Sequence, residues 1–357
     1  MVKLDEVICG LSAFRYHRTP PFVLGLYPPI VDFGRNHWRK QLATAPLIAD
    51  ILGIPLHIFA FSRSERTGAL NIRQHLVSDE LPIGSVVWDE ELDLQITSPC
   101  MTLFTLGRSV SDVHLLMAMY EFCGSFTVFR PSQEIEAYLE RHAASAPFGA
   151  DGGWSRVRDG SGTPTDLWKR SPLIEVEELR AFASEVEHIR GGKRFSKIAH
   201  MVSGVAASPF EVQVSILLGL PRSKGGEGLS GFSNNFEVRF SRDARQIANQ
   251  IRAYADIYFE GDGKRPPLAI ECQGGIVHSG DAASMSDADR MLAMQNMGVH
   301  VLPMTYRQIA SANNFRRIIR LISKKLGKPY REKTDRMLAS ERELRRELFI
   351  DWLTLGE

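Results

Sequence analysis

Two short apolar runs separated by a turn-rich stretch constrain the fold of this chain more than any other feature. The first run is 255–259 (ADIYF) and the second is 268–273 (LAIECQ), while 260–267 between them is rich in Gly, Asp and Pro. Both runs alternate in character, which predicts a β-hairpin. A turn at the middle of the intervening stretch places Asp256 opposite Glu271 on the neighbouring strand.

The hairpin predicts a pair of acids on one face of a sheet. Because successive side chains of a strand point to opposite faces, we expect Asp256 to share its face with Tyr258, Ala269, Glu271 and Gln273. Like charges placed directly opposite each other are destabilising, so this pair calls for a cation. Mg²⁺ (or Mn²⁺) suits an all-oxygen site, with Asp256 and Glu271 as ligands. The alternative is an exposed hairpin with two solvated carboxylates, but the second run is too apolar for an edge ribbon.

The length of the chain favours two domains. With 357 residues and 44% hydrophobic residues, the chain can build more than one core, and the pattern of elements is α+β. We expect residues 1–146 to form an α+β domain, 147–172 a linker or long loop, 173–330 a second domain, and 331–357 a charged terminal helix. Within the first domain, 22–26 is expected to be a strand.

Charge and cysteine content narrow the classes of function. The net charge of +1 argues against a uniformly basic surface. Binding of nucleic acids would therefore require basic residues gathered on one part of the surface. The four cysteines lie far apart and form no C-x-x-C pair, which indicates neither a zinc site nor a disulfide framework. No run approaches the length of a membrane span, and the expected location is the cytoplasm, without membrane contact.

Two further residues are candidates for the acidic site. Ser208, Pro209 and Glu211 fit the start of a helix, where Glu211 either closes a capping box on the Ser208 amide or supplies a third acid to the metal. His278 follows the second apolar run in a polar loop, where it is either a bystander or a group that touches the metal or a phosphate.

A helix expected between residues 305 and 326 is basic on one side. The stretch 306–328 contains several Arg and Lys residues and no acid, with an apolar stripe on the opposite face. A solvated basic face is the simple explanation, but beside an acidic metal site such a face suits a phosphate backbone. The candidate DNA-binding residues are Arg307, Arg316, Arg317, Arg320 and Lys324.

Residues 208–310 resemble the PD-(D/E)xK nuclease superfamily, in its very-short-patch-repair-endonuclease-like branch. The matching order is a helix with Glu211, a strand with Asp256, and a strand with Glu271-x-Gln273-Gly274, then His278 and a helix with Asp289-Arg290. The resemblance implies a mixed β-sheet flanked by helices, with Asp256 and Glu271 binding Mg²⁺ for phosphodiester hydrolysis. Gln273 occupies the slot where the superfamily often has a lysine that steadies the attacking water; an amide orients water but supplies no positive charge.

The front half is similar to the C-terminal part of abortive-infection-type antitoxins. The similarity lies in 9–17 (CGLSAFRYH) and in 96–103 (ITSPCMTL). Two functions are therefore expected. The first is a metal-dependent DNA endonuclease of phage defence or DNA repair, with DNA as its partner. The alternative is a catalytically inactive nuclease-fold antitoxin or regulatory protein with a toxin as its partner.

Overall fold

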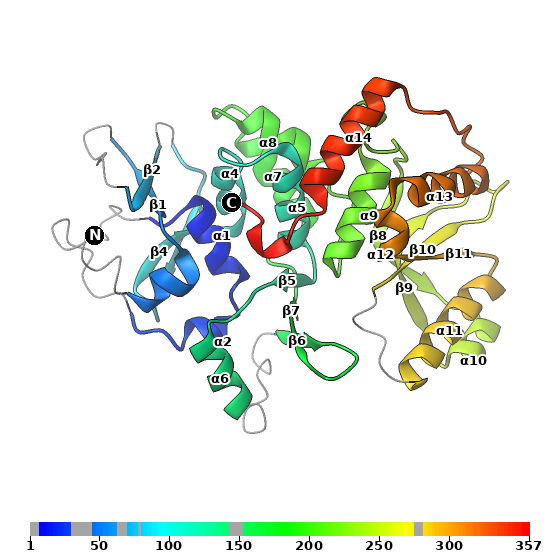
Figure 1. Cartoon of the computed structure of the whole chain (residues 1–357), viewed down its shortest axis with the longest axis horizontal. Helices are drawn as coiled ribbons and strands as arrows, with labels where there is room; N and C mark the ends of the chain where they lie inside the picture. The colour runs from blue at the N-terminus through cyan, green and yellow to red at the C-terminus, as the bar shows by residue number, and fades with distance from the viewer. Residues whose placement is uncertain (1–6, 30–44, 63–69, 78–79, 143–152, 275–280) are drawn as a thin grey trace.

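The computed structural model describes residues 7–29, 45–62, 70–77, 80–142, 153–274 and 281–357. Helices alternate with short strands along the chain (Figure 1), which confirms the α+β class. The elements of the first half are α1 (Gly10–Arg18), α2 (Pro21–Leu24), β1 (Leu56–Ala60), β2 (Ile72–Leu76), β3 (Val86–Asp89), β4 (Leu94–Thr97), α4 (Pro99–Leu106), α5 (Asp112–Cys123), β5 (Phe126–Val128), α6 (Gln133–His142), β6 (Ser155–Arg158) and β7 (Pro164–Lys169). None of the helices in these ranges has the length and apolar character needed to cross a bilayer.

The second half is built around a mixed sheet of four strands. Its elements are α7 (Val176–Glu185), α8 (Gly192–Ala199), α9 (Pro209–Gly219), β8 (Phe232–Arg239), α10 (Arg242–Ala248), β9 (Arg252–Phe259), β10 (Leu268–Gln273), α11 (Asp281–Asn296), β11 (His300–Thr305), α12 (Tyr306–Ala310), α13 (Ala312–Lys325) and α14 (Asp335–Leu348). The strand order is β11-β10-β9-β8, with β10 parallel to β11 and antiparallel to β9. The second apolar run of the sequence is therefore a central strand, as its composition predicted.

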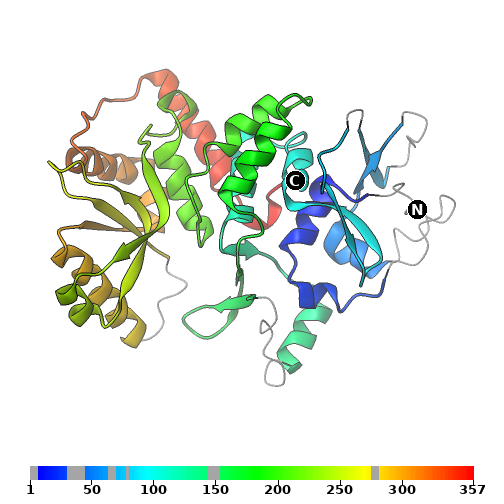
Figure 2. The same cartoon turned by 180° about the vertical axis from the view of Figure 1, so that it is seen from behind.

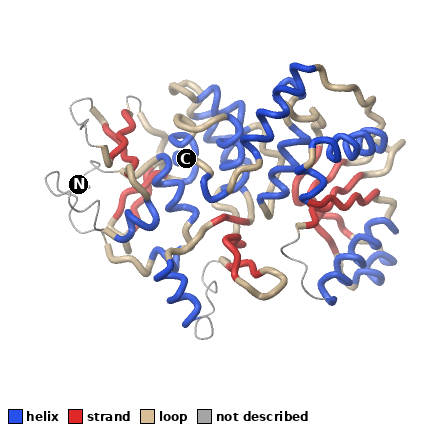
Figure 3. Tube along the Cα trace, viewed as in Figure 1, coloured by secondary structure: helices blue, strands red, loops and turns tan. Residues whose placement is uncertain are grey.

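Helices cover both faces of this sheet (Figure 3). One face packs in the same hydrophobic cluster as α9 and α13, which includes Ile270 of β10 and Phe315 of α13. The other face packs with α10 and α11, where Ala269 lies in a second cluster with Ala293 and Met294. The alternation of β10 between two buried faces explains why its sequence is almost continuously apolar.

The hairpin register agrees with the prediction from the sequence. β9 and β10 pair Ile270 with Ile257, and Leu268 with Phe259. The ladder ends at this pair of isoleucines, one step before Asp256 and Glu271, so the predicted pairing of these two acids is not part of it. The connection between the strands supplies a turn in which Gly263 adopts a φ of +78°, a conformation that favours glycine.

The core continues from the first half of the chain into the second. One hydrophobic cluster contains Phe14 of α1, Tyr120 of α5, Ile270 of β10 and Leu348 of α14. The C-terminal segment after α14 returns to the first half, as seen from both sides in Figures 1 and 2. There Arg15 forms an ion pair of 2.7 Å with Glu357. The domain boundaries expected from the sequence remain predictions.

The structure differs from the expected elements in three places. Residues 22–26 do not form a strand: Pro21 begins the short helix α2, because its fixed φ suits the first helical position. Part of 147–172 is not a simple loop, because β6 and β7 form a hairpin that pairs with β5. The helix expected over 305–326 is divided by Ser311, which ends α12 and caps α13.

Candidate active site

Asp256 lies where β9 and β10 separate. The last paired residues of the two strands are Ile257 and Ile270. Beyond them, Oδ2 of Asp256 accepts a hydrogen bond of 2.6 Å from the backbone N–H of Cys272. The carboxylate oxygen therefore accepts a hydrogen bond that a backbone carbonyl accepts elsewhere in the sheet. This bond holds Asp256 at the point where the pairing of the two strands ends.

The side-chain alternation of β9 breaks at Asp256. Ala255 and Ile257 would share a face in a regular strand, yet they pack in the two different hydrophobic clusters on opposite sides of the sheet. The neighbouring strand is also irregular, because Asn235 has a φ of +51°. Tyr258 and Ala269 do pack with α11, as expected for their face. The irregularity turns the Asp256 carboxylate toward β10, which strict alternation did not predict.

Glu271 is a buried acid on the central strand. Its side chain is 3% exposed, and Oε2 accepts a hydrogen bond of 2.9 Å from Nη2 of Arg290 on α11. Arg290 is 31% exposed on its side chain, so the pair connects a buried carboxylate to a partly solvated guanidinium. This charge-assisted hydrogen bond from Arg290 stabilises the Glu271 carboxylate inside the protein.

Glu211 is positioned by the start of α9. Ser208 is the N-cap and Pro209 the first helical residue, and the Ser208 hydroxyl accepts a hydrogen bond from the Glu211 N–H. The Glu211 carboxylate accepts hydrogen bonds from the Ser208 hydroxyl at 2.8 Å and from the Ala207 N–H at 2.7 Å. The capping arrangement expected from the sequence is thus present, but it closes on the amide of Ala207 in place of that of Ser208.

The three acids influence one another electrostatically. Burial, followed by the negative charge of Asp256 and a smaller effect of Glu271, raises the pKa of Glu211 to about 8. Burial together with the charges of Asp256, Glu211 and Glu271 raises the pKa of the Cys272 thiol well above its usual range. Glu211 therefore closes the cap and also lies within electrostatic reach of the other two acids, while its second role, as a third acid on the metal, stays a prediction.

The donor set fits a hard divalent cation in one particular mode. Within the described ranges, no group of three or more His, Cys, Asp or Glu side chains is arranged to hold a metal ion by itself. Mg²⁺ commonly binds through one or two carboxylates and completes its coordination with water and substrate phosphate oxygens. The carboxylates of the half-buried Asp256 and the buried Glu271 suit this mode, because they are oxygen ligands in surroundings that disfavour unneutralised negative charge.

Gln273 and His278 are the other two predicted site residues. Gln273 is the last residue of β10 and is half-buried, two positions after Glu271, so it lies at the same end of the strand. His278 lies outside the described residues. Arg290 is the residue whose role sequence reasoning missed: it appeared there only as part of a helix motif. In the sequence, the feature that could have indicated this contact is a basic residue on the helix that follows the strand with Glu271.

The basic side chains are placed differently from the acids. α13 packs on the face of the sheet opposite α11, through Phe315. Its C-terminal end lies by the turn between β9 and β10, where the Leu326 carbonyl accepts a hydrogen bond from Arg265. This turn is at the other end of β10 from Gln273. The structure therefore does not bring Lys324 to the acids, whereas Arg307 on α12 directly follows the end of β11 nearest to them.

Acids from outside the basic stretch neutralise part of the stripe. Arg320 forms an ion pair of 2.6 Å with Glu332, and Arg316 approaches Glu341 of α14 at 3.8 Å. Arg307, Arg317 and Lys324 are exposed to solvent. Counting only residues 306–328 therefore overestimates the positive charge of this surface.

Comparison with known proteins gives no relative from which a role could be transferred. No protein-family model, curated protein or solved structure matches this chain.

Proposed function

We propose that this chain is a metal-dependent endonuclease that hydrolyses phosphodiester bonds of DNA in the cytoplasm, in phage defence or DNA repair. The observation that carries the proposal is the group of three acids at one end of the central strand: the buried Glu211 and Glu271 and the half-buried Asp256. Burying several carboxylates together is costly unless a cation balances them, and enzymes accept this cost where the cation does chemistry.

Two acids of the group and two residues beside them have roles in the proposal. Asp256 and Glu271 hold Mg²⁺ or Mn²⁺, which when bound activates water and stabilises negative charge on the phosphate. Gln273 orients the attacking water through its side-chain amide. Arg290 supplies, from α11, the positive charge that a lysine at position 273 would otherwise provide, since its guanidinium already reaches Glu271.

DNA is the proposed substrate because Arg307 follows the strand end nearest to the acids and further exposed cations lie on α13. Arg307 begins the surface that continues along α13, and Arg317 and Lys324 extend it. In this proposal Arg307 contacts the phosphates closest to the cleaved bond. Arg317, Arg320, Arg316 and Lys324 contact more distant phosphates and contribute mainly salt-dependent affinity.

The test is metal-dependent cleavage by the full chain and two charge-removing variants. Plasmid and single-stranded DNA are incubated with Mg²⁺ or Mn²⁺ and with a chelator. We expect cleavage that requires metal and is lost in Asp256→Asn and in Glu271→Gln. Glu260→Gln, which changes an exposed carboxylate in the same hairpin, is the matched control and should cleave normally. Retention of cleavage in both site variants would end the proposal.

One observation favours the alternative, an inactive nuclease-fold antitoxin or regulatory protein that binds a toxin. Arg290 already forms an ion pair with Glu271 without any metal. The buried acid can therefore be stable in a protein that has no catalytic activity. Titration of the protein with Mn²⁺ by calorimetry separates the two functions. Binding that is lost in Asp256→Asn supports the enzyme, and no binding at millimolar metal supports the antitoxin.

A further inference from the structure

A second site candidate lies away from the acidic group. A cavity of about 770 Å³ separates α7 and the segment 200–205 from α9 and β8. Its volume is in the range of small-molecule sites, which commonly form where two parts of a fold meet. Aliphatic side chains such as Val176 and Leu220 line part of it.

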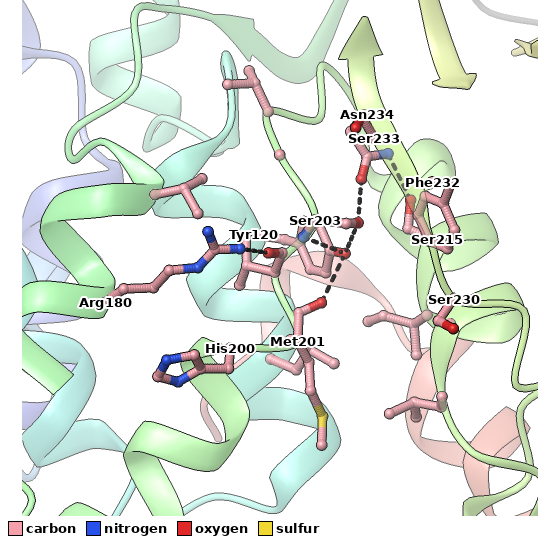
Figure 4. Close-up of a pocket in the computed structure, with 18 of the residues that line it drawn as sticks. Tyr120, Arg180, His200, Met201, Ser203, Ser215, Ser230, Phe232, Ser233 and Asn234 are labelled. Carbon is pink, nitrogen blue, oxygen red and sulfur yellow. Dashed lines mark hydrogen bonds between the residues drawn. The ribbon is translucent and has the colours of Figure 1, made fainter. Parts of the chain in front are cut away.

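A chain of hydrogen bonds forms one wall of this cavity (Figure 4). The Tyr120 and Ser203 hydroxyls are 2.7 Å apart, and the Ser203 hydroxyl donates to Asn234 Oδ1 at 2.6 Å. Asn234 Nδ2 in turn donates to the Ser215 hydroxyl at 2.7 Å. The wall is therefore rigid and polar, and its side chains are held in place before any ligand arrives.

Arg180 brings a positive charge to the same wall. It extends from α7 toward Ser203 (Figure 4), and its Nη2 donates to the Val202 carbonyl at 2.9 Å. Its Nε is buried, and among the described residues it has no hydrogen-bond partner. A buried N–H of a guanidinium normally has an acceptor. Arg180 also lines the cavity, so its guanidinium supplies positive charge beside an anion bound there.

The remaining lining residues suit a ligand with a flat, hydroxyl-bearing body. His200 stands beside the cavity below Arg180, and Phe232 lies across from it (Figure 4). Nδ1 of His200 is 2.7 Å from the Ser196 carbonyl, so Nδ1 carries the proton and Nε2 is on the other side of the ring. Glu175 and Glu177 are exposed at the start of α7 and can accept hydrogen bonds from hydroxyl or amino groups.

We propose that this cavity binds a small anion with a flat ring and hydroxyl groups, the chemical class of nucleoside monophosphates. The phosphate contacts Arg180, the ring packs against Phe232, and Nε2 of His200 accepts a hydrogen bond from a hydroxyl or amino group of the ligand. The ligand's hydroxyl or amino groups face the carboxylates of α7. This proposal does not depend on the nuclease function, because its test measures binding alone.

The site also has a direct connection to the acidic group. Asn234 Nδ2 donates to the backbone carbonyl of Asp256 at 3.2 Å, in addition to its bond with Ser215. A ligand that engages Ser203 changes the partner of Asn234 and thereby the support of the strand that carries Asp256. We therefore expect that ligand binding in the cavity changes the geometry of that strand.

The experiment measures binding of AMP, adenosine and inorganic phosphate to the full chain by calorimetry and by thermal shift. We expect AMP to bind and raise the melting temperature. Phosphate should bind more weakly, and adenosine more weakly than AMP. Arg180→Ala should weaken AMP binding about tenfold or more, because it removes a charge-assisted hydrogen bond. Arg190→Ala, an exposed arginine outside the lining residues, is the matched control and should bind as the parent does.

Three results would overturn the proposal: no AMP binding at millimolar concentration, equal binding by Arg180→Ala and the control, or adenosine binding as tightly as AMP. Arg180 also supports the Val202 carbonyl, so circular dichroism checks that each variant is folded. If Arg180→Ala does not fold, His200→Ala replaces it. Weakened AMP binding in that variant supports the site, and unchanged binding rejects it.

Discussion

The carboxylate of Asp256 accepts a hydrogen bond from the backbone of Cys272, at a distance of 2.6 Å between Oδ2 and N. This bond replaces a ladder bond at the point where β9 and β10 diverge. The same side chain therefore has a structural role, as an acceptor, and a proposed chemical role, as a charged metal ligand. The two roles can be separated by substitution.

Asp256→Asn and Asp256→Ala should differ in stability and agree in activity. Asparagine keeps an oxygen acceptor for the Cys272 N–H, so its free energy of unfolding should stay close to that of the parent. Alanine leaves this N–H without its partner and should cost about 1–3 kcal/mol. Both variants lose the charge, and we expect cleavage to fall by about a hundredfold or more in each. Urea unfolding and DNA cleavage measured on the same samples check this; an active Asp256→Asn would contradict the metal role.

Arg290→Ala should make the protein more dependent on a divalent cation. Removing the guanidinium leaves the buried Glu271 carboxylate uncompensated, at an expected cost of about 1–3 kcal/mol, reduced because Arg290 is partly exposed. If a metal binds at Glu271, Mn²⁺ should raise the melting temperature of this variant more than that of the parent.

The matched control for that measurement is Arg317→Ala, an exposed arginine on α13. Its response to Mn²⁺ should equal that of the parent. An equal response of Arg290→Ala and the parent would indicate that no cation binds beside Glu271.

The sequence predicted the hairpin because its signals are local. Alternating apolar runs around a Gly- and Pro-rich turn determine register and faces together, and the observed pairing of Ile270 with Ile257 follows from them. The helix start at Ser208 was predicted for the same reason, because Ser208 caps α9 through a bond to a residue three positions away.

What the sequence did not predict depends on contacts between distant residues. The break of alternation at Asp256 arises where two strands diverge, and nothing in the alternating pattern marks that position. The ion pair between Arg290 and Glu271 joins a helix to a strand, and the neutralisation of Arg320 comes from Glu332 beyond the basic stretch. Hydrophobic periodicity carries no information about such pairs.

The first half of the chain should lose stability in mild acid. Burial lowers the pKa of His17 to about 4. Burial and the nearby His75 lower the pKa of His57 to about 3, and burial with the charge of Arg73 lowers that of His75 to about 4. In the unfolded chain each imidazole titrates near pH ~6.5. The folded pKa values are the lower ones, so the unfolded state binds more protons between these limits. Stability is therefore complete above the unfolded pKa and falls as the pH decreases toward the folded one.

Urea unfolding at about pH 7, 6 and 5 measures this effect, and each histidine contributes a slope of up to about 1.4 kcal/mol per pH unit. His17→Gln removes one titrating group and should flatten the dependence. His188→Gln, at an exposed position, is the control and should leave the slope unchanged. An equal pH dependence of His17→Gln and the parent would show that this imidazole is not held neutral.

Trp352→Phe should destabilise the whole chain, because Trp352 connects its C-terminal segment to a buried charge. Glu121 is fully buried and accepts hydrogen bonds from Arg18 at 2.8 Å, from Thr127 at 2.6 Å and, through its other oxygen, from Nε1 of Trp352 at 2.6 Å. Phenylalanine keeps most of the apolar volume but removes the indole N–H, which should cost about 1–3 kcal/mol.

The exposed Trp88 provides the control, and Trp88→Phe should change stability little. Since the segment packs in the same hydrophobic cluster as both halves, thermal unfolding should remain a single transition at a lower temperature. Two separate transitions in Trp352→Phe would instead mean that the two halves unfold independently once this bond is lost.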